Sequence, residues 1–312
     1  MINSVRNTVL SILNKNNYGY ISPSDFNLFA KQAQMDIFED YFYTYNRQIN
    51  NENGRASGTG YADITKSIEE AIDLFSVTKY LRQSVSNKFF LPSLITTGDD
   101  YYLMNKVLVY ERFRVSGANT SVVANQLVDT AATFTATVAA GDVVVNTTTY
   151  QQAEILSVVS DTVLSLDDNI FTATPQDYAV FQSVQNEAEK VSHSKITMLN
   201  SGMITSPSVI FPVYTEEAGV LKVSPKDVAE DGRVLAQYIR YPKEPKWTFR
   251  SLPNGEPAFD QSQTDYQDFE LPLDDEPSLI TKILQYAGMS IRETQVVQFA
   301  NAEEQKENQK QA

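Results

Sequence analysis

The feature that most constrains the fold of this chain is a long stretch without basic residues. Between Arg114 and Lys190 there is no Lys or Arg, and Thr, Val and Ala dominate. Seven acidic residues lie in this stretch up to residue 183: Asp129, Asp142, Glu154, Asp161, Asp167, Asp168 and Asp177. A composition that changes this abruptly indicates a separate module inserted in a chain of different character. We place its edges near residues 115 and 185 and assign the inserted domain to 115–189.

Alternating apolar residues predict that this module is all-β. We expect about five short strands with frequent turns, which is the pattern of a small sandwich or barrel. The expected strands lie at 133–138, 143–145, 154–159, 163–166 and 178–181, and Gly141-Asp142 marks one of the turns.

The segments on both sides of the module combine helix and strand signals. Ser22-Pro23-Ser24-Asp25 supplies a capping hydroxyl, a proline for the first helical position and an early acid, so a helix begins here. A second helix is expected over 64–75, and Asp275-Glu276-Pro277 caps a C-terminal helix that ends or bends at Gly288. Strands are expected at 101–103, 107–114, 209–213, 220–223 and 234–241, with a loop over 50–60.

The sequence therefore predicts an α+β fold. N-terminal helices and a C-terminal helix frame a mixed β core, made of residues 1–114 and 190–292, into which the small β domain is inserted. The polar tail, residues 293–312, is expected to be a fraying helix or an arm that orders on a partner.

Composition argues against most catalytic chemistry. The 312 residues include no Cys and one His, which excludes thiolate sites and sites with two imidazoles. That histidine, His193, lies between two serines, and adjacent residues cannot form a catalytic triad. Paired acids such as Asp99-Asp100 lack the ligand spacing of a calcium loop. We predict no enzymatic activity, no cofactor, no metal and no small-molecule ligand.

Net charge and hydropathy argue against two classes of partner, nucleic acids and membranes. With 25 Lys and Arg against 39 Asp and Glu, the net charge is -14, which disfavours a protein that binds nucleic acid through its phosphates. The sequence has neither a secretion signal nor a run of apolar residues long enough to span a membrane, so we expect no membrane partner.

Two regions of the sequence are candidates for contacts between subunits, because they carry more apolar or charged side chains than the core of a single chain can accommodate. The first long helix adds Phe38, Phe42, Tyr43 and Tyr45 to an apolar face that is already complete, and we expect them to pack against a neighbouring subunit.

A basic cluster and an acidic cluster follow each other near the C-terminus. Arg240, Lys243, Lys246 and Arg250 surround Trp247, and the acids after them include Asp268, Asp274 and Asp275. Two interpretations stay open. The charges form salt bridges within the chain, each contributing little, or they meet between identical neighbours in a head-to-tail ring with Trp247 as an anchor.

Several strings resemble a known family. They are residues 18–27 (YGYISPSDFN), 60–64 (GYADI) leading to 69–73 (EEAID), 238–247 (YIRYPKEPKW), and 268–272 (DFELP) leading to 283–292 (ILQYAGMSIR). Together they resemble neck and tail ring proteins of crAss-like tailed bacteriophages, in which stacked rings extend the portal. The module, with 141–148 (GDVVVNTT) and 178–181 (YAVF), is similar to a small β domain inserted in phage structural proteins.

This resemblance implies a structural protein of the virion, assembled in the bacterial host cytoplasm. It implies a dodecameric ring, contacts with the portal and other ring proteins, and genomic DNA that passes through the channel without specific binding. An acidic wall suits such a channel because it repels phosphate. A receptor-binding or head-decoration protein is the alternative. A polysaccharide-degrading tail enzyme is a weaker one, since a single Trp makes a poor sugar platform.

Overall fold

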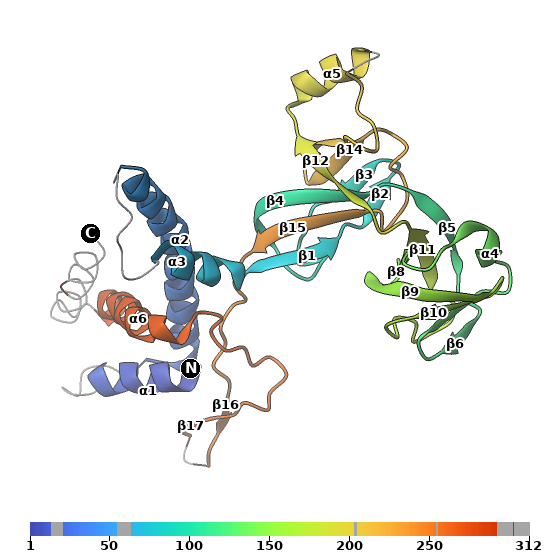
Figure 1. Cartoon of the computed structure of the whole chain (residues 1–312). Helices are drawn as coiled ribbons and strands as arrows, with labels where there is room; N and C mark the ends of the chain where they lie inside the picture. The colour runs from blue at the N-terminus through green and yellow to red at the C-terminus, as the bar shows by residue number, and fades with distance from the viewer. Residues whose placement is uncertain (14–20, 55–63, 203–204, 254, 292–301, 303–312) are drawn as a thin grey trace. The chain divides into compact units, whose positions relative to one another are not determined.

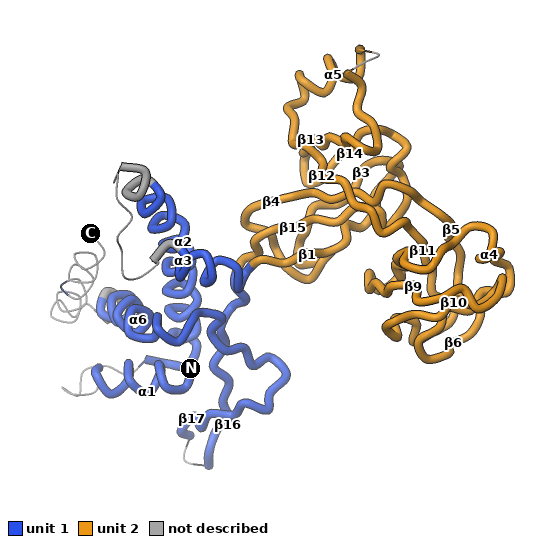
Figure 2. Tube along the Cα trace, viewed as in Figure 1, with its two compact units in different colours: residues 1–75, 242–312 blue, residues 76–241 orange. Residues whose placement is uncertain are grey.

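The computed structural model describes residues 1–13, 21–54, 64–202, 205–253, 255–291 and 302. They form two compact units, Met1–Phe75 with Pro242–Ala312, and Ser76–Tyr241 (Figure 2). The fold is α+β with N-terminal helices, a C-terminal helix and mixed sheets, as the sequence predicts. The loop expected over 50–60 is wrong for 50–54, which belong to the helix Pro23–Gly54, while the rest of it and most of the polar tail lie outside the described residues.

The first unit is helical. Its elements are α1 (Ile2–Leu13), α2 (Pro23–Gly54), α3 (Ile64–Asp73), the short 3-10 turn η2 (Leu273–Asp275), α6 (Glu276–Ile291) and the hairpin β16 (Phe249–Ser251) with β17 (Pro257–Phe259) (Figure 1). α2 begins where predicted, and Ser22 Oγ accepts a hydrogen bond of 3.2 Å from Asp25 N. α2 packs against α3 and α6, and α1 packs against α6.

The prediction that the helix ends at Gly288 is wrong, because α6 continues to Ile291, and a bend there stays a prediction. A glycine inside a helix costs about 1 kcal/mol relative to alanine. The apolar face of α6 outweighs this cost, since Leu279, Ile283, Leu284 and Ala287 are all buried.

An eight-stranded sheet forms one half of the second unit. Its order is β1 (Ser76–Tyr80), β15 (Val234–Arg240), β4 (Tyr101–Tyr110), β12 (Gln185–Lys190), β13 (Val213–Glu217), β14 (Val220–Ser224), β3 (Lys88–Phe90) and β2 (Gln83–Val85). Only the pairing of β12 with β13 is parallel among the described strands. α5 (His193–Ser201) follows β12 and has no buried residue.

Two strand predictions in this sheet need correction. The segments 101–103 and 107–114 are expected as separate strands, but the first segment and the first half of the second form the single strand β4. The strand expected over 209–213 is a turn, because Pro207 and Pro212 flank it and β13 starts only at Val213.

A seven-stranded sheet forms the other half of this unit. Its order is β5 (Phe113–Ala118), β11 (Asp177–Phe181), β8 (Val143–Asn146), β9 (Gln151–Ser160), β10 (Val163–Leu166), β7 (Gln126–Val128) and β6 (Ser121–Val123). Val115 of β5 and Leu127 of β7 pack in one core cluster although their strands are far apart in the sheet order, so the sheet curls around its core. β12 lies within the expected insertion but belongs to the other sheet.

The strand expected over 133–138 is instead the short helix α4 (Phe134–Thr137). Its buried residues, Phe134 and Val138, are four positions apart, which is helical rather than alternating spacing. The sheet also has more strands than expected, because β6 and β7 have only three residues each, too few to show an alternating pattern.

Aromatic side chains join the two sheets. The ring of Tyr110, at the end of β4, stacks on Phe181 of β11 with centroids 5.1 Å apart. The hydroxyls of Tyr80 and Tyr110 lie 2.8 Å apart, and Tyr80 also donates to Gln152 of the curled sheet. Burial raises the pKa of both tyrosines, so they stay neutral and serve as hydrogen-bonding groups.

Arg233 holds the chain where it passes between these sheets. Its side chain is 5% exposed and forms an ion pair of 2.6 Å with Glu230. The guanidinium also donates to the carbonyl oxygens of Tyr110 (3.0 Å), Glu111 (2.8 Å) and Asp227 (2.8 Å). One cation thus satisfies three backbone acceptors that would otherwise lose water without gaining a partner.

We predict that Arg233→Ala destabilises the protein by about 3 kcal/mol or more, because it removes the cation beside the half-buried Glu230 carboxylate and leaves the carbonyls of Tyr110, Glu111 and Asp227 without this donor. Urea unfolding followed by circular dichroism measures the change. Arg112→Ala is the matched control, since Arg112 is exposed and the change should stay within about 0.5 kcal/mol. Equal unfolding midpoints for the two variants would contradict the role given to Arg233.

Candidate functional site

The only histidine of the chain lies beside two glutamates of β13. The His193 side chain is 60% exposed at the start of α5. Its Nε2 lies 3.1 Å from the carbonyl oxygen of Glu216, and its Nδ1 lies 3.6 Å from the Glu217 carboxylate. The described part of the chain contains no cluster of three or more acidic or imidazole side chains that could hold a metal ion.

Among the described helices, none is both long and apolar enough to cross a lipid bilayer.

The four aromatic residues assigned to a subunit interface divide between core and surface. Phe38 is fully buried and makes edge contacts with Phe42 (5.2 Å) and Phe75 (5.0 Å), so its assignment to an interface is wrong. Phe42 is half-buried in that cluster. Tyr45 is also half-buried and donates a 2.8 Å hydrogen bond to Glu69. Tyr43 is 69% exposed and remains accessible to a partner.

Trp247 is the centre of a buried cluster rather than an interface anchor. Its side chain is 2% exposed, with the Arg6 guanidinium 3.8 Å from the ring centroid. The rings of Phe249 and Phe259 stack at 5.7 and 5.9 Å.

Two asparagines complete this environment. The indole Nε1 of Trp247 donates to Asn3 at 3.1 Å, and its backbone N donates to Asn27 at 2.8 Å. The cluster therefore connects the N-terminal helices to the segment that follows Tyr241, and the role predicted for Trp247 is wrong because its own chain already covers the ring.

Several of the charged residues pair within the chain. Lys246 forms an ion pair of 2.5 Å with Asp265, whose hydrogen bond from Lys246 lowers the pKa of that acid. Lys243 N donates to Glu270 at 2.8 Å. The first of the two interpretations, salt bridges within the chain, therefore holds for Lys246.

The Asp268 carboxylate accepts hydrogen bonds from main-chain nitrogens of the same chain. It accepts hydrogen bonds of 2.8 Å from both Ile2 N and Phe269 N and one of 3.1 Å from the Met1 amino nitrogen. Burial raises the pKa of Asp268, but these hydrogen bonds outweigh burial and hold it below its usual range.

The remaining charged residues are more dispersed. Asp275 accepts a hydrogen bond from Tyr41, while Asp274 and Arg250 are exposed. Arg240 lies at the end of β15, in the second unit, and donates to the Tyr241 carbonyl at 3.2 Å. The sequence places these side chains in one patch, but the fold divides Arg240 from the others. Arg240, Arg250 and Asp274 keep their interface assignment as a prediction.

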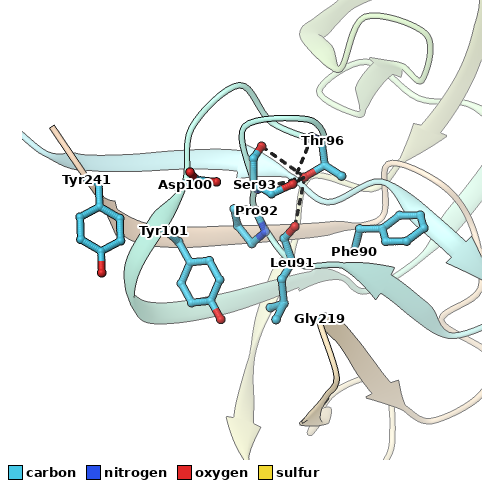
Figure 3. A pocket seen from close by; sticks show the side chains of 9 residues that line it. All are labelled: Phe90, Leu91, Pro92, Ser93, Thr96, Asp100, Tyr101, Gly219 and Tyr241. Atoms are coloured by element: carbon cyan, nitrogen blue, oxygen red, sulfur yellow. Dashed lines mark hydrogen bonds between the residues drawn. The ribbon is translucent and has the colours of Figure 1, made fainter. Parts of the chain in front are cut away.

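The structure also shows an open hollow that the sequence does not predict. It has a volume of about 480 Å³ and lies in the second unit (Figure 3). Its lining residues are Phe90, Leu91, Pro92, Ser93, Thr96, Asp100, Tyr101, Gly219 and Tyr241. Ala218 and Gly219 both have positive φ and form the tight turn between β13 and β14, and a Cβ on Gly219 would meet no atom, so the glycine leaves this wall open.

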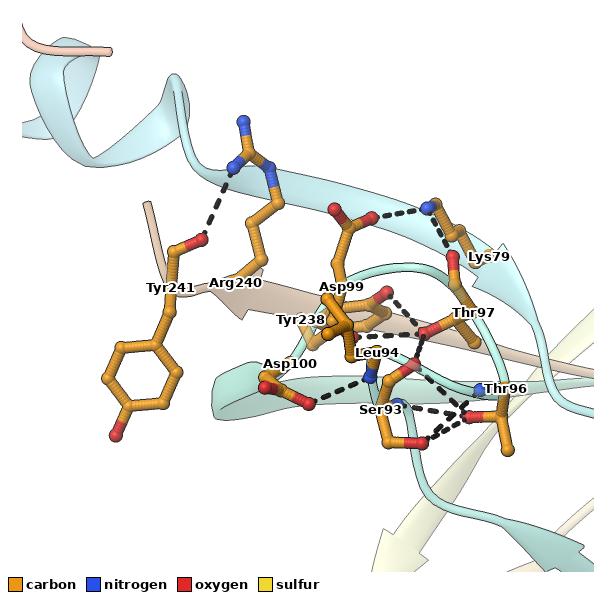
Figure 4. Close-up of polar contacts among 10 residues, drawn as sticks. All are labelled: Lys79, Ser93, Leu94, Thr96, Thr97, Asp99, Asp100, Tyr238, Arg240 and Tyr241. Atoms are coloured by element: carbon orange, nitrogen blue, oxygen red, sulfur yellow. Dashed lines mark hydrogen bonds and ion pairs between the residues drawn. The ribbon is translucent and has the colours of Figure 1, made fainter. Parts of the chain in front are cut away.

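A hydrogen-bonded loop, residues 91–100, forms one side of the hollow. Thr96 Oγ1 donates to the Leu91 carbonyl at 3.0 Å and accepts from Ser93 N at 3.0 Å, while Asp100 accepts from Leu94 N at 2.8 Å (Figure 4). Lys79 pairs with Asp99 in the same network. The loop is therefore fixed by its own polar groups.

The second surface feature missed by the sequence analysis is a proline turn, which we define as residues 206–212. Ile210 and Phe211 at its tip are 56% and 77% exposed. Phe211 N donates to Ser208 Oγ at 3.2 Å, and Asn186 Nδ2 of β12 donates to the Val209 carbonyl at 3.0 Å. The prolines mark the turn in the sequence, but only the fold shows that the two apolar side chains face water.

Neither a scan against models of protein families nor a search of curated proteins finds a match for this chain.

Trp247→Ala should destabilise the first unit by about 3–5 kcal/mol, because it removes the ring on which Phe249, Phe259 and Arg6 pack. Because Trp247 is the only tryptophan, the variant has no tryptophan fluorescence, and thermal unfolding is therefore measured by circular dichroism. Leu273→Ala, at a side chain that is 74% exposed, should change stability by less than about 0.5 kcal/mol. A folded Trp247→Ala variant of unchanged stability would contradict the placement of Trp247 in the core.

Asp268→Asn should destabilise the protein at neutral pH and lose its effect in acid. The native pKa of Asp268 lies below the unfolded value of about 3.9, so the ionised carboxylate stabilises the fold above that pH. The stabilisation is lost as pH falls through the native pKa. The difference in urea midpoint between variant and parent should therefore be smaller at pH 3 than at pH 7. Asp274→Asn, at an exposed side chain, is the control, and a constant difference at both pH values would contradict the assignment.

Proposed function

We propose that this chain is a structural subunit of a homo-oligomeric ring in the neck or tail of a tailed bacteriophage. In this proposal the ring extends the portal channel and connects the capsid to the tail. The observation that carries the proposal is a set of exposed apolar side chains on ordered elements: Tyr43, Leu94, Ile95, Ile210 and Phe211. Exposed apolar groups on a rigid frame are typical of surfaces that bind other proteins.

Three further points support a structural role. The strings that resemble ring proteins lie in both units, and the residue types needed for most catalytic sites are scarce. The net charge of -14 suits a conduit through which DNA slides, because an acidic wall repels phosphate. The buried aromatic side chains Tyr80, Tyr110 and Phe181 join the curled seven-stranded sheet to the eight-stranded sheet. Such a connection suits a structural component under mechanical load.

The proposal includes the copy number and neighbours that the resemblance implies: a dodecamer that contacts the portal and other ring proteins, in a virion assembled in the host cytoplasm. Cryo-electron microscopy of the virion tests it directly. A ring density in the neck or tail that accommodates both units would support the proposal. Density at fibres or on the capsid surface would favour the receptor-binding or head-decoration alternative.

Tyr43→Asp is predicted to reduce ring formation by about tenfold or more while leaving the monomer folded, because a charge on an exposed contact residue opposes burial in an interface. Tyr43→Phe, which retains the ring, is the control and should assemble normally. Electron microscopy counts the rings, and circular dichroism checks the monomer. Normal assembly of Tyr43→Asp would remove α2 from the interface.

A further inference from the structure

The second unit carries an apolar projection and an apolar hollow at opposite ends of one hairpin. The proline turn ends at Pro212, directly before β13, whose first residue Val213 pairs with Ser224 of β14. The hollow lies at the other end, where Val220 of β14 pairs with Phe90 of β3. A five-residue strand separates the two ends by roughly 13 Å, so the turn cannot fill the hollow of its own chain.

The projection is built to hold its shape. Pro207 and Pro212 restrict the backbone, Ser208 N donates to the Phe211 carbonyl at 3.3 Å, and Glu189 N of β12 donates to the Pro212 carbonyl at 3.0 Å. Phe211 nevertheless exposes 77% of its surface to water. An aromatic side chain on a fixed backbone has only two rotatable bonds to order on binding, which suits an interface anchor.

The hollow offers a complementary environment. Phe90, Tyr101 and Tyr241 supply aromatic surface around it, and loop 91–100 is fixed by its hydrogen bonds (Figure 3). The only charged residue in its lining, Asp100, accepts a hydrogen bond from Leu94 N. Asp100 is exposed, so an aromatic ring that packs against Phe90 and Tyr101 need not remove its charge from water.

Charge also favours a second copy of this chain as the occupant. Two copies each carry a net charge of -14, so they repel unless their contact surfaces are uncharged or opposite in sign. Residues 206–212 (SPSVIFP) contain no charged side chain. A projection and a hollow on different ends of the same subunit form a head-to-tail contact, which generates rings when the rotation closes.

We propose that the proline turn of one copy inserts Phe211 and Ile210 into the hollow of the next copy. This contact deepens the proposed function, on which its place in a closed ring rests. It assigns the seam between neighbouring subunits to the ends of the β13–β14 hairpin rather than to the charged clusters near Trp247.

Cysteine crosslinking tests the contact cleanly because the native chain contains no cysteine. Phe211→Cys and Phe90→Cys proteins are prepared separately, mixed and treated with a short bis-maleimide. We expect a covalent heterodimer in the mixture, at least about tenfold more abundant than the homodimer formed by either variant alone. Leu156→Cys replaces Phe211→Cys as a control, since Leu156 is 57% exposed on β9.

Three outcomes would overturn the inference. They are a heterodimer no more abundant than with Leu156→Cys, a Phe211→Cys homodimer as abundant as the heterodimer, and normal ring formation by Phe211→Asp. The last result would leave the ring proposal standing. A Phe211–Phe90 crosslink in protein that forms only open chains would support the contact and contradict the closed ring.

Discussion

The arrangement of the second unit depends on one buried cation. At Tyr110 and Glu111 the chain leaves the eight-stranded sheet for the curled sheet, and the carbonyl oxygens there cannot continue the β4 ladder. The Arg233 guanidinium binds both carbonyls and, in the same plane of donors, Asp227 and Glu230. A lysine has the charge but not the fork of donors needed for several acceptors at once. The buried stack of Tyr110 on Phe181 then forms beside this fixed corner.

The first unit also depends on a cation, the Arg6 guanidinium, which packs on Trp247. Segments from the two ends of the chain meet at Trp247, where a cation covers the ring and two asparagines satisfy its polar groups. In the sequence the same tryptophan stands among Lys243, Lys246 and Arg250, and so resembles an anchor in a basic surface patch. Its true partners, Arg6 and Asn3, lie more than two hundred positions away, and no local pattern points to them.

Local signals in the sequence predicted local structure well. The cap at Ser22 marks the start of α2, and the alternation over 163–166 matches β10, because caps and short strands depend on neighbouring residues. The errors have a common cause. Phe38 continues a helical stripe whether the covering ring belongs to the same chain or to a partner, and only the contact with Phe75 decides between them. The sequence does not predict the hollow because four segments that are separate in the sequence line it.

The segments that carry exposed apolar side chains on this molecule are held by hydrogen bonds from polar side chains. Thr96 and Asp100 satisfy the backbone of the loop that carries Leu94 and Ile95, and Ser208 and Asn186 do the same for the turn that carries Phe211. A flexible loop would fold these side chains back against its own surface. Ordering them in water sacrifices part of the hydrophobic free energy that burial would return, and this cost supports the proposed assembly. An acidic subunit can assemble with itself only where contacts of this uncharged kind outweigh its electrostatic repulsion.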